Sequence, residues 1–323
     1  MRLCQRVFPI DVEVRYERAL ETTRSRSDAG FPAALEAARS SDAVVLFLGE
    51  ESILSGEAHS RADIRLPGIQ ERLISELSAT GKPIVLVVLA GRPLALEAVV
   101  DDVDAILYAW HPGSMAGPAI ADVLFGEESP SGKLPVTFPR VTGQIPIYYA
   151  HKNTGKPPTP ETVVHIDDIP RDAEQLSAGG SSFLLDAGHT PLWPFGHGLS
   201  YTEFSYSDIR LSREVVSMGD SLTIEVDVAN VGERAAEEVT QLYVRDPVAS
   251  VTRPVRELKG FRRVRLAPGE TRTVSFELHT DDLAFHGRDM RRRTEPGRFH
   301  LWIGGSSTAH LRAEFEISHP SKE

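Results

Sequence analysis

The sequence predicts an α/β domain built on an open, mainly parallel sheet flanked by helices, followed by an all-β sandwich. Two observations predict this order. Short apolar runs alternate with helical segments over residues 32–125, and strand-like alternation punctuated by turn residues replaces them after Tyr201. A length of 323 residues, 41% of them hydrophobic, suits two domains of ordinary size. We therefore expect domains at residues 1–201 and 202–323.

The first domain is predicted from the period of its apolar residues. The run of residues 43–48 is continuously apolar and ends at Gly49, which is typical of a strand buried on both faces. The helix predicted next is amphipathic and is stopped by Gly81 and Pro83. The predicted elements, in order, are helix 32–39, strand 43–48, helix 67–80, strand 84–89, strand 104–109 and helix 114–125. Ligands meet such sheets at the carboxyl ends of the strands, so the loop after Gly49 is a candidate site.

The second domain is predicted from short alternating strands. Before it, prolines break any long helix, and the polar stretch at about 151–190 is expected to be a long surface loop within the first domain. Segments with strand-like alternation are 221–231, 239–244, 271–278, 299–303 and 311–317. About seven short strands over this length fit an immunoglobulin-like or fibronectin type III-like sandwich. The single cysteine, Cys4, excludes the variety that has an internal disulfide.

Composition and motifs argue against several classes of partner. The formal net charge of −11 disfavours a nucleic-acid partner. No run approaches 18 apolar residues, so we expect no membrane-spanning segment. Neither a P-loop nor a dinucleotide fingerprint occurs, and no His, Cys and carboxylate cluster has metal spacing, so neither a cofactor nor a metal is predicted. The first ten residues lack the pattern of a signal peptide, so any export signal is expected upstream of them.

The loop of residues 49–61 contains the side chains best suited to catalysis. Glu50, Glu51 and Glu57 are three glutamates within eight residues, at the expected mouth of the sheet. Composition alone favours a solvated surface loop over a catalytic carboxylate and leaves both open.

A longer pattern runs from this loop through nearly the whole chain. Its segments are Gly49-Glu50, Gly56-Glu57-Ala58-His59-Ser60-Arg61, Gly91-Arg92-Pro93, Ser131-Gly132-Lys133-Leu134-Pro135, Gly143-Gln144-Ile145-Pro146, Pro194-Phe195-Gly196-His197-Gly198-Leu199-Ser200-Tyr201 and Arg253-Pro254-Val255-Arg256-Glu257-Leu258-Lys259-Gly260-Phe261. In this order they resemble the second and third domains of family 3 glycoside hydrolases, of the bacterial periplasmic β-glucosidase type.

The resemblance implies a role in retaining hydrolysis of β-linked glucosides or related oligosaccharides. One carboxylate attacks the anomeric carbon, and a carboxylic acid about 5 Å away protonates the leaving oxygen and then activates water. By position in the motif, the acid/base is Glu57, with Glu50 as the runner-up. His59 and Arg61 are expected to contact substrate, although a plain loop role for His59 and an anchoring role for Arg61 stay open. The family's nucleophile is an Asp in a Ser-Asp-Trp type motif on a preceding (β/α)8 barrel.

That barrel has no counterpart in this sequence. Only about 30 residues precede the first predicted helix, whereas a barrel takes about 250, and no Asp-Trp pair occurs. We therefore expect the C-terminal portion of a β-glucosidase-like or β-xylosidase-like enzyme, with negligible activity in isolation. The barrel would come from the same gene, which we favour, or from another chain. The alternative is a non-catalytic sugar-binding or interaction module that partners a separate barrel. Full-length enzymes of this type are periplasmic or secreted, and the compartment of this chain stays open.

Overall fold

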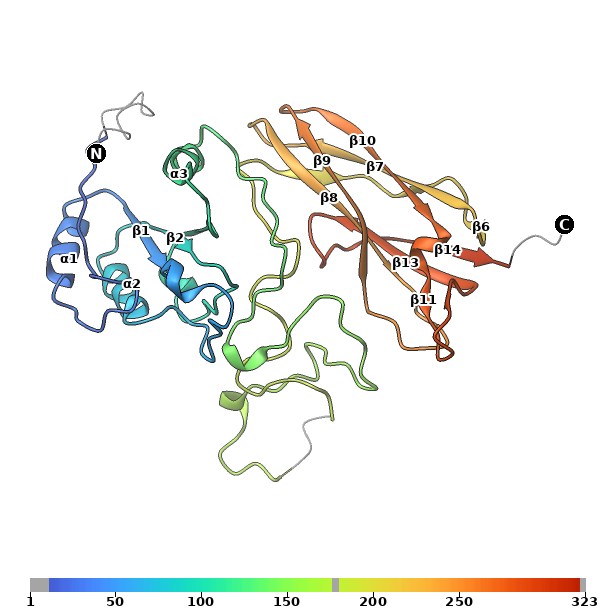
Figure 1. The fold of residues 1–323 in the computed structure, drawn as a ribbon, viewed down its shortest axis with the longest axis horizontal. Coiled ribbons are helices and arrows are strands. Elements are labelled where there is room, and N and C mark those ends of the chain that lie inside the picture. The colour runs from blue at the N-terminus through green and yellow to red at the C-terminus, as the bar shows by residue number, and fades with distance from the viewer. Residues whose placement is uncertain (1–11, 176–179, 320–323) are drawn as a thin grey trace. The chain divides into compact units, whose positions relative to one another are not determined.

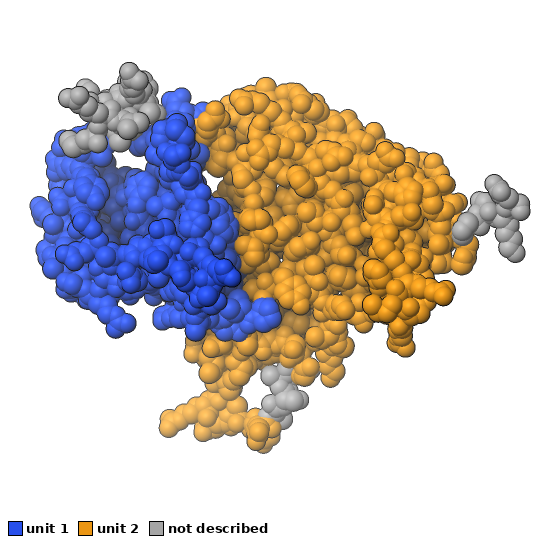
Figure 2. Space-filling view, in the orientation of Figure 1, with its two compact units in different colours: residues 1–127, 138–146 blue, residues 128–137, 147–323 orange. Residues whose placement is uncertain are grey.

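The computed structural model describes residues 12–175 and 180–319 and divides into two compact units (Figure 2). Unit 1 holds the chain up to Glu127 together with Phe138–Pro146, and unit 2 holds Glu128–Thr137 and the chain from Ile147. The chain therefore passes between the units more than once. The expected domain boundary after residue 201 stays a prediction, and residues 176–179 of the expected long loop lie outside the described residues.

Unit 1 is built on a three-stranded parallel sheet with the order β1-β2-β3. Strands β1 and β2 are labelled in Figure 1. The sheet and its helices match the predicted order of elements, so the predicted parallel α/β architecture is confirmed. The bounds are α1 (Phe31–Arg39), β1 (Val44–Gly49), α2 (Gln70–Ser78), β2 (Ile84–Leu89), β3 (Ala105–Tyr108) and α3 (Ala116–Leu124).

One face of β1 packs against helices α1 and α2, and the opposite face is largely exposed. Val44, Leu46 and Leu48 lie against a buried cluster that includes residues of both helices. Val45 and Phe47 on the opposite face are 41% and 55% exposed. The prediction that this strand is buried on both faces was therefore wrong. An apolar run does not distinguish a central strand from an edge strand, and β1 has a single partner, β2, among the described strands.

Unit 2 contains the predicted β-sandwich. One sheet has the order β6-β14-β13-β8-β9 and the other β10-β7-β4, with β5 also paired to β7. Alternate residues of β7 (Leu222, Ile224, Val226 and Val228) are fully buried in the core between the sheets. The bounds are β4 (Phe204–Tyr206), β5 (Arg210–Leu211), β6 (Val215–Ser217), β7 (Ser221–Asn230), β8 (Ala236–Arg245), β9 (Glu257–Leu266), β10 (Thr271–His279), β11 (Phe285–His286), β12 (Arg292–Arg293), β13 (Gly297–Gly304) and β14 (Leu311–Ser318).

The segment that precedes the sandwich in unit 2 packs onto β8. Gln241 Nε2 donates to the carbonyl of Gly196 at 3.2 Å, and Tyr149 meets Tyr243 edge-on with ring centroids 5.8 Å apart. The hydroxyl of Tyr149 also accepts from the backbone N–H of Leu258 at 3.2 Å. Both faces of β8 are consequently buried, which fixes the irregular segment against the sandwich.

Candidate active site

The candidate loop begins where β1 ends, and a buried glutamine fixes that end. Gln70 is fully buried, and its amide accepts from Gly49 N at 2.7 Å and donates to Gly49 O at 2.8 Å. The same amide nitrogen donates to the carbonyl of Thr23 at 2.8 Å. A side-chain amide thus takes the place of a further strand at this point of the sheet. The loop after Gly49 therefore starts from a rigid position.

Gly49 itself has no room for a side chain. Its φ is +130°, and a Cβ would lie 2.1 Å from the carbonyl oxygen of Leu89. We expect Gly49→Ala to lower the free energy of unfolding by about 2 kcal/mol more than Gly81→Ala. Gly81 is a matched control because its φ is also positive, at +71°, with nothing within 4 Å of the added Cβ. Scanning calorimetry of both variants measures the difference, and equal losses would contradict the close approach.

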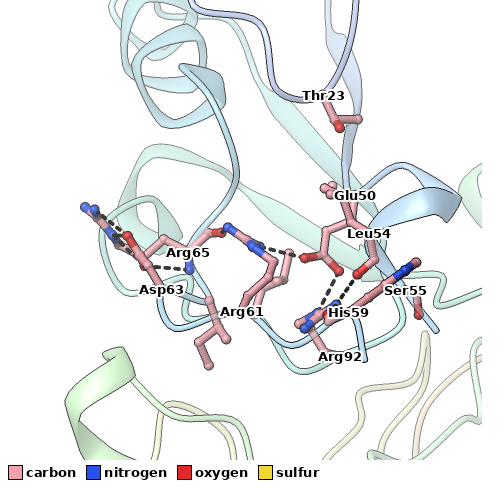
Figure 3. A network of polar contacts seen from close by, with 12 residues as sticks. Thr23, Glu50, Leu54, Ser55, His59, Arg61, Asp63, Arg65 and Arg92 are labelled. Carbon is pink, nitrogen blue, oxygen red and sulfur yellow. Dashed lines mark hydrogen bonds and ion pairs between the residues drawn. The ribbon is translucent and has the colours of Figure 1, made fainter. Parts of the chain in front are cut away.

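Glu50 is the hub of a buried ion-pair network. Its side chain is 0% exposed; Arg61 Nη1 lies 2.6 Å from Oε1, and Arg92 Nε lies 3.0 Å from Oε2. Figure 3 shows the carboxylate between the two guanidinium groups. Both carboxylate oxygens are therefore engaged, and neither faces solvent where a leaving group could meet it. This geometry suits a structural role better than proton transfer.

The two arginines that pair with Glu50 also donate hydrogen bonds to backbone carbonyls in and just after the loop. Arg92 Nη2 donates to the carbonyl of Leu54 and, at 3.1 Å, to that of His59. Arg61 Nη2 donates to the carbonyl of Arg65 at 2.9 Å (Figure 3). The backbone is thereby held on both sides of Glu57. A tight turn between these anchors has a defined position even though its residues are exposed.

Glu57 lies in that turn. His59 N donates to Gly56 O at 3.2 Å, which closes the turn around Glu57 and Ala58. The φ of Gly56 is +142°, and that of Ala58 is +62°, a conformation that a residue with a Cβ rarely adopts. Glu57 is exposed, and its side chain makes no hydrogen bond or ion pair with any described residue. The arrangement leaves the Glu57 carboxyl available for an external group.

The other two predicted site residues differ in their surroundings. His59 is exposed, and its ring lies beside Gly56, since a Cβ there would be 3.5 Å from His59 Nδ1. Arg61 has a half-buried side chain that is taken up by Glu50 and the Arg65 carbonyl. Substrate contact by either residue stays a prediction.

The loops after β2 and β3 complete the site. They include Arg92, to which the sequence motif assigned no role, and His111, which follows the third predicted strand and was expected to pack in the core or a loop rather than to contact substrate. Ser55 Oγ lies 3.4 Å from His111 Nε2, and both approach Gly91 so closely that a Cβ there would be 2.4 Å from Ser55 Oγ. The hydroxyl of Tyr108 donates to the Arg92 carbonyl, and burial raises the pKa of Tyr108, which keeps this donor protonated. The sequence feature that could have indicated Arg92 and His111 is their position shortly after apolar strands, which Glu50 shares.

Trp110 packs within unit 1. Its ring meets Tyr108 at 4.7 Å and Phe138 at 5.8 Å, both edge-on. This ring packing suits a core or loop role for Trp110.

Within residues 12–175 and 180–319, no group of three or more His, Cys, Asp and Glu side chains is arranged to hold a metal ion. No helix in those ranges is both long and apolar enough to cross a bilayer.

Comparison with known proteins gives matches over almost the whole chain. The model of the glycosyl hydrolase family 3 C-terminal domain matches residues 9–201, and that of a fibronectin type III-like domain matches residues 238–307. A periplasmic beta-glucosidase of Salmonella typhimurium is 43% identical over 94% of this chain and 38% of its own length. A beta-xylosidase of Formosa agariphila is 39% identical over 92% of this chain and 38% of its own length.

Solved structures agree with these sequence matches. The beta-glucosidase from Listeria innocua in complex with glucose has a TM-score of 0.84 and 38% identity, over 92% of this chain and 39% of that one. A beta-glucosidase from Kluyveromyces marxianus has a TM-score of 0.73 and 28% identity, over 90% of this chain and 33% of that one. The chain thus spans about 38% of the length of the curated relatives that it matches first.

Proposed function

This chain belongs to glycosyl hydrolase family 3, and on that premise we propose that it supplies the general acid/base of a retaining β-glucosidase or β-xylosidase. In this proposal Glu57 is the acid/base, and the nucleophile comes from a (β/α)8 barrel. The curated relatives named beta-glucosidase and beta-xylosidase support this substrate class.

The contrast between Glu57 and Glu50 carries the proposal. Both glutamates lie in one loop at the carboxyl end of the sheet, but the Glu50 carboxylate is buried between Arg61 and Arg92. Glu57 is exposed, has no described side-chain partner and lies in a turn anchored on both sides by Arg92. A general acid must reach the leaving oxygen of a bound sugar and exchange its proton there. Glu57 meets this requirement, and Glu50 instead holds the loop.

The chemistry then divides between two domains. The barrel Asp attacks the anomeric carbon while Glu57 gives its proton to the departing oxygen, and a glycosyl-enzyme ester forms. In the second step Glu57 takes a proton from water, and this water attacks the anomeric carbon and releases the barrel Asp. The chain needs its partner because a lone acid/base neither forms the ester nor holds the sugar in place.

The purified chain alone is expected to have no detectable turnover of an aryl β-glucoside or aryl β-xyloside. Release of nitrophenol over hours at high protein concentration is a sensitive measurement. Steady release by the pure chain, lost in Glu57→Gln, would contradict this expectation, because it would place a nucleophile within the chain.

Complementation by a barrel tests the function itself. A barrel domain that carries the Ser-Asp-Trp motif, taken from a family relative, is mixed with this chain or fused to its N-terminus. Hydrolysis that needs both parts supports the proposal. A complex that binds sugar without turnover supports the non-catalytic module instead. If the mixed parts form no complex, the idea of a separate subunit fails, and the fusion alone tests the acid/base.

A further inference from the structure

A cavity of about 370 Å³ lies in unit 2 and is lined by residues of that unit alone. None of its lining residues belongs to the loop of residues 49–61. Its walls come from the irregular segments around residues 147–151 and 189–194 and from loops of the sandwich at 255–256 and 307–310. The volume is within the range of small-molecule sites. No Asp or Glu lines the cavity, although the chain has 46 acidic residues against 35 basic ones. The cavity therefore lacks the acidic residues that are in excess in the chain as a whole.

Arg256 supplies a fixed positive charge at this cavity. Its guanidinium lies 4.2 Å from the ring centroid of Trp302, and Nη1 donates to the carbonyls of Ser307 at 2.6 Å and Ala309 at 2.8 Å. These contacts fix the side chain with neutral partners only. No carboxylate among residues 12–175 and 180–319 forms an ion pair with Arg256. Its guanidinium is therefore held in place with its charge uncompensated, which suits recognition of an external anion.

The remaining walls offer hydrogen bonds and an aromatic surface. His151, His189 and His310 line the cavity, and so does Tyr148, a residue that is 56% exposed. The wall that carries His151 is attached to the sandwich, because the backbone N–H of Val255 donates to the His151 carbonyl at 2.8 Å. Imidazoles bind the hydroxyls and charged oxygens of a ligand, and an exposed aromatic ring packs on the apolar face of a sugar ring.

We propose that this cavity binds an anionic monosaccharide, whose carboxylate or phosphate group meets Arg256 and whose ring lies against Tyr148. Carboxylated and phosphorylated sugars share this chemistry, and the binding experiment distinguishes them. The site is separate from the role proposed for Glu57, so either proposal can fail while the other stands.

Titration calorimetry on the full chain tests the site with four probes: glucuronate, glucose 6-phosphate, inorganic phosphate and neutral glucose. Glucuronate or glucose 6-phosphate is expected to bind at least about tenfold more tightly than glucose, which corresponds to one favourable charge contact. The stronger of the two identifies the carboxylate or the phosphate as the preferred group. Inorganic phosphate is expected to bind more weakly than the sugar anions, because it makes no contact with Tyr148.

Two pairs of variants show whether the charge of the cavity is responsible. Arg256→Gln is expected to weaken binding by at least about tenfold, whereas Arg298→Gln, on the exposed part of β13, removes the same charge without effect. Because Arg256→Gln could impair folding, the second pair changes exposed Thr308, which lines the cavity. Thr308→Glu is expected to weaken binding of the anion by about tenfold. Thr308→Gln, whose side chain has the shape of glutamate without its charge, is expected to leave binding unchanged.

Three results would overturn the proposal. The first is that no sugar anion binds at millimolar concentration. The second is that glucose binds as tightly as the anions. The third is that Thr308→Glu and Thr308→Gln have the same affinity.

Discussion

Glu57→Gln is expected to lower the turnover of an aryl β-glucoside by about 10²- to 10⁴-fold once a barrel domain is supplied. Glutamine keeps the shape of the side chain but neither protonates the leaving oxygen nor deprotonates water. The folded structure should be unaffected, because the Glu57 side chain has no partner among the described residues. Steady-state kinetics on the fusion or the mixed complex measures the loss.

A chemical rescue distinguishes an acid/base from a residue that only shapes the site. Azide attacks a glycosyl-enzyme ester without needing a general base, so it should restore turnover of an activated aryl glucoside by Glu57→Ala and yield a glycosyl azide. Glu51→Gln is the control, because it removes a carboxylate from the same loop that is paired with exposed Arg24 at 3.0 Å. Full activity in Glu57→Gln, or rescue by azide in Glu50→Ala instead, would move the acid/base role to Glu50.

The second large effect is expected on stability, from Glu50→Gln. The substitution leaves Arg61 and Arg92 facing a neutral amide in a buried position, which costs about 3 kcal/mol of unfolding free energy. Loss of the glutamate also frees the guanidiniums that hold the carbonyls of Leu54, His59 and Arg65. Activity in the complemented enzyme should therefore fall as well, through poor placement of Glu57.

Calorimetry of Glu50→Gln and Glu51→Gln compares the losses in unfolding free energy of two variants in the same loop. The ion pair of Glu51 is with Arg24, whose side chain is 56% exposed, and this pair should be worth about 1 kcal/mol or less. Similar losses in the two variants would show that the network around Glu50 does not stabilise unit 1. Azide should give no rescue in Glu50→Gln. Azide replaces water and the base that activates it, and it cannot restore the position of the loop.

The sequence predicted most of the regular structure because apolar periodicity reports directly on burial within one element. The helices and strands of unit 1 appear in the predicted order, and the alternation of Leu222, Ile224, Val226 and Val228 predicted β7 correctly. Strand β9 (Glu257–Leu266) was not predicted, because much of it is exposed and charged and its pattern hardly differs from that of a loop.

The candidate site was predictable in its loop but not in its contacts. The motif placed Glu50 and Glu57 in one loop and left the choice between them to position in the pattern. The structure separates their environments through Arg92, which is 42 residues from Glu50 along the chain. Such a pairing depends on how β1 and β2 lie together, and no local period records it. Assignment of the acid/base to Glu57 remains the proposal that these contacts support.

The exposed face of β1 has a consequence for how the protein is prepared and stored. Val45 and Phe47 present apolar side chains from a strand whose only described partner is β2. Such a strand can recruit a second copy of itself by backbone pairing, and the chance rises with concentration. A preparation made alone should therefore lose material on concentrating or on storage, and lysine at position 47 should improve the yield.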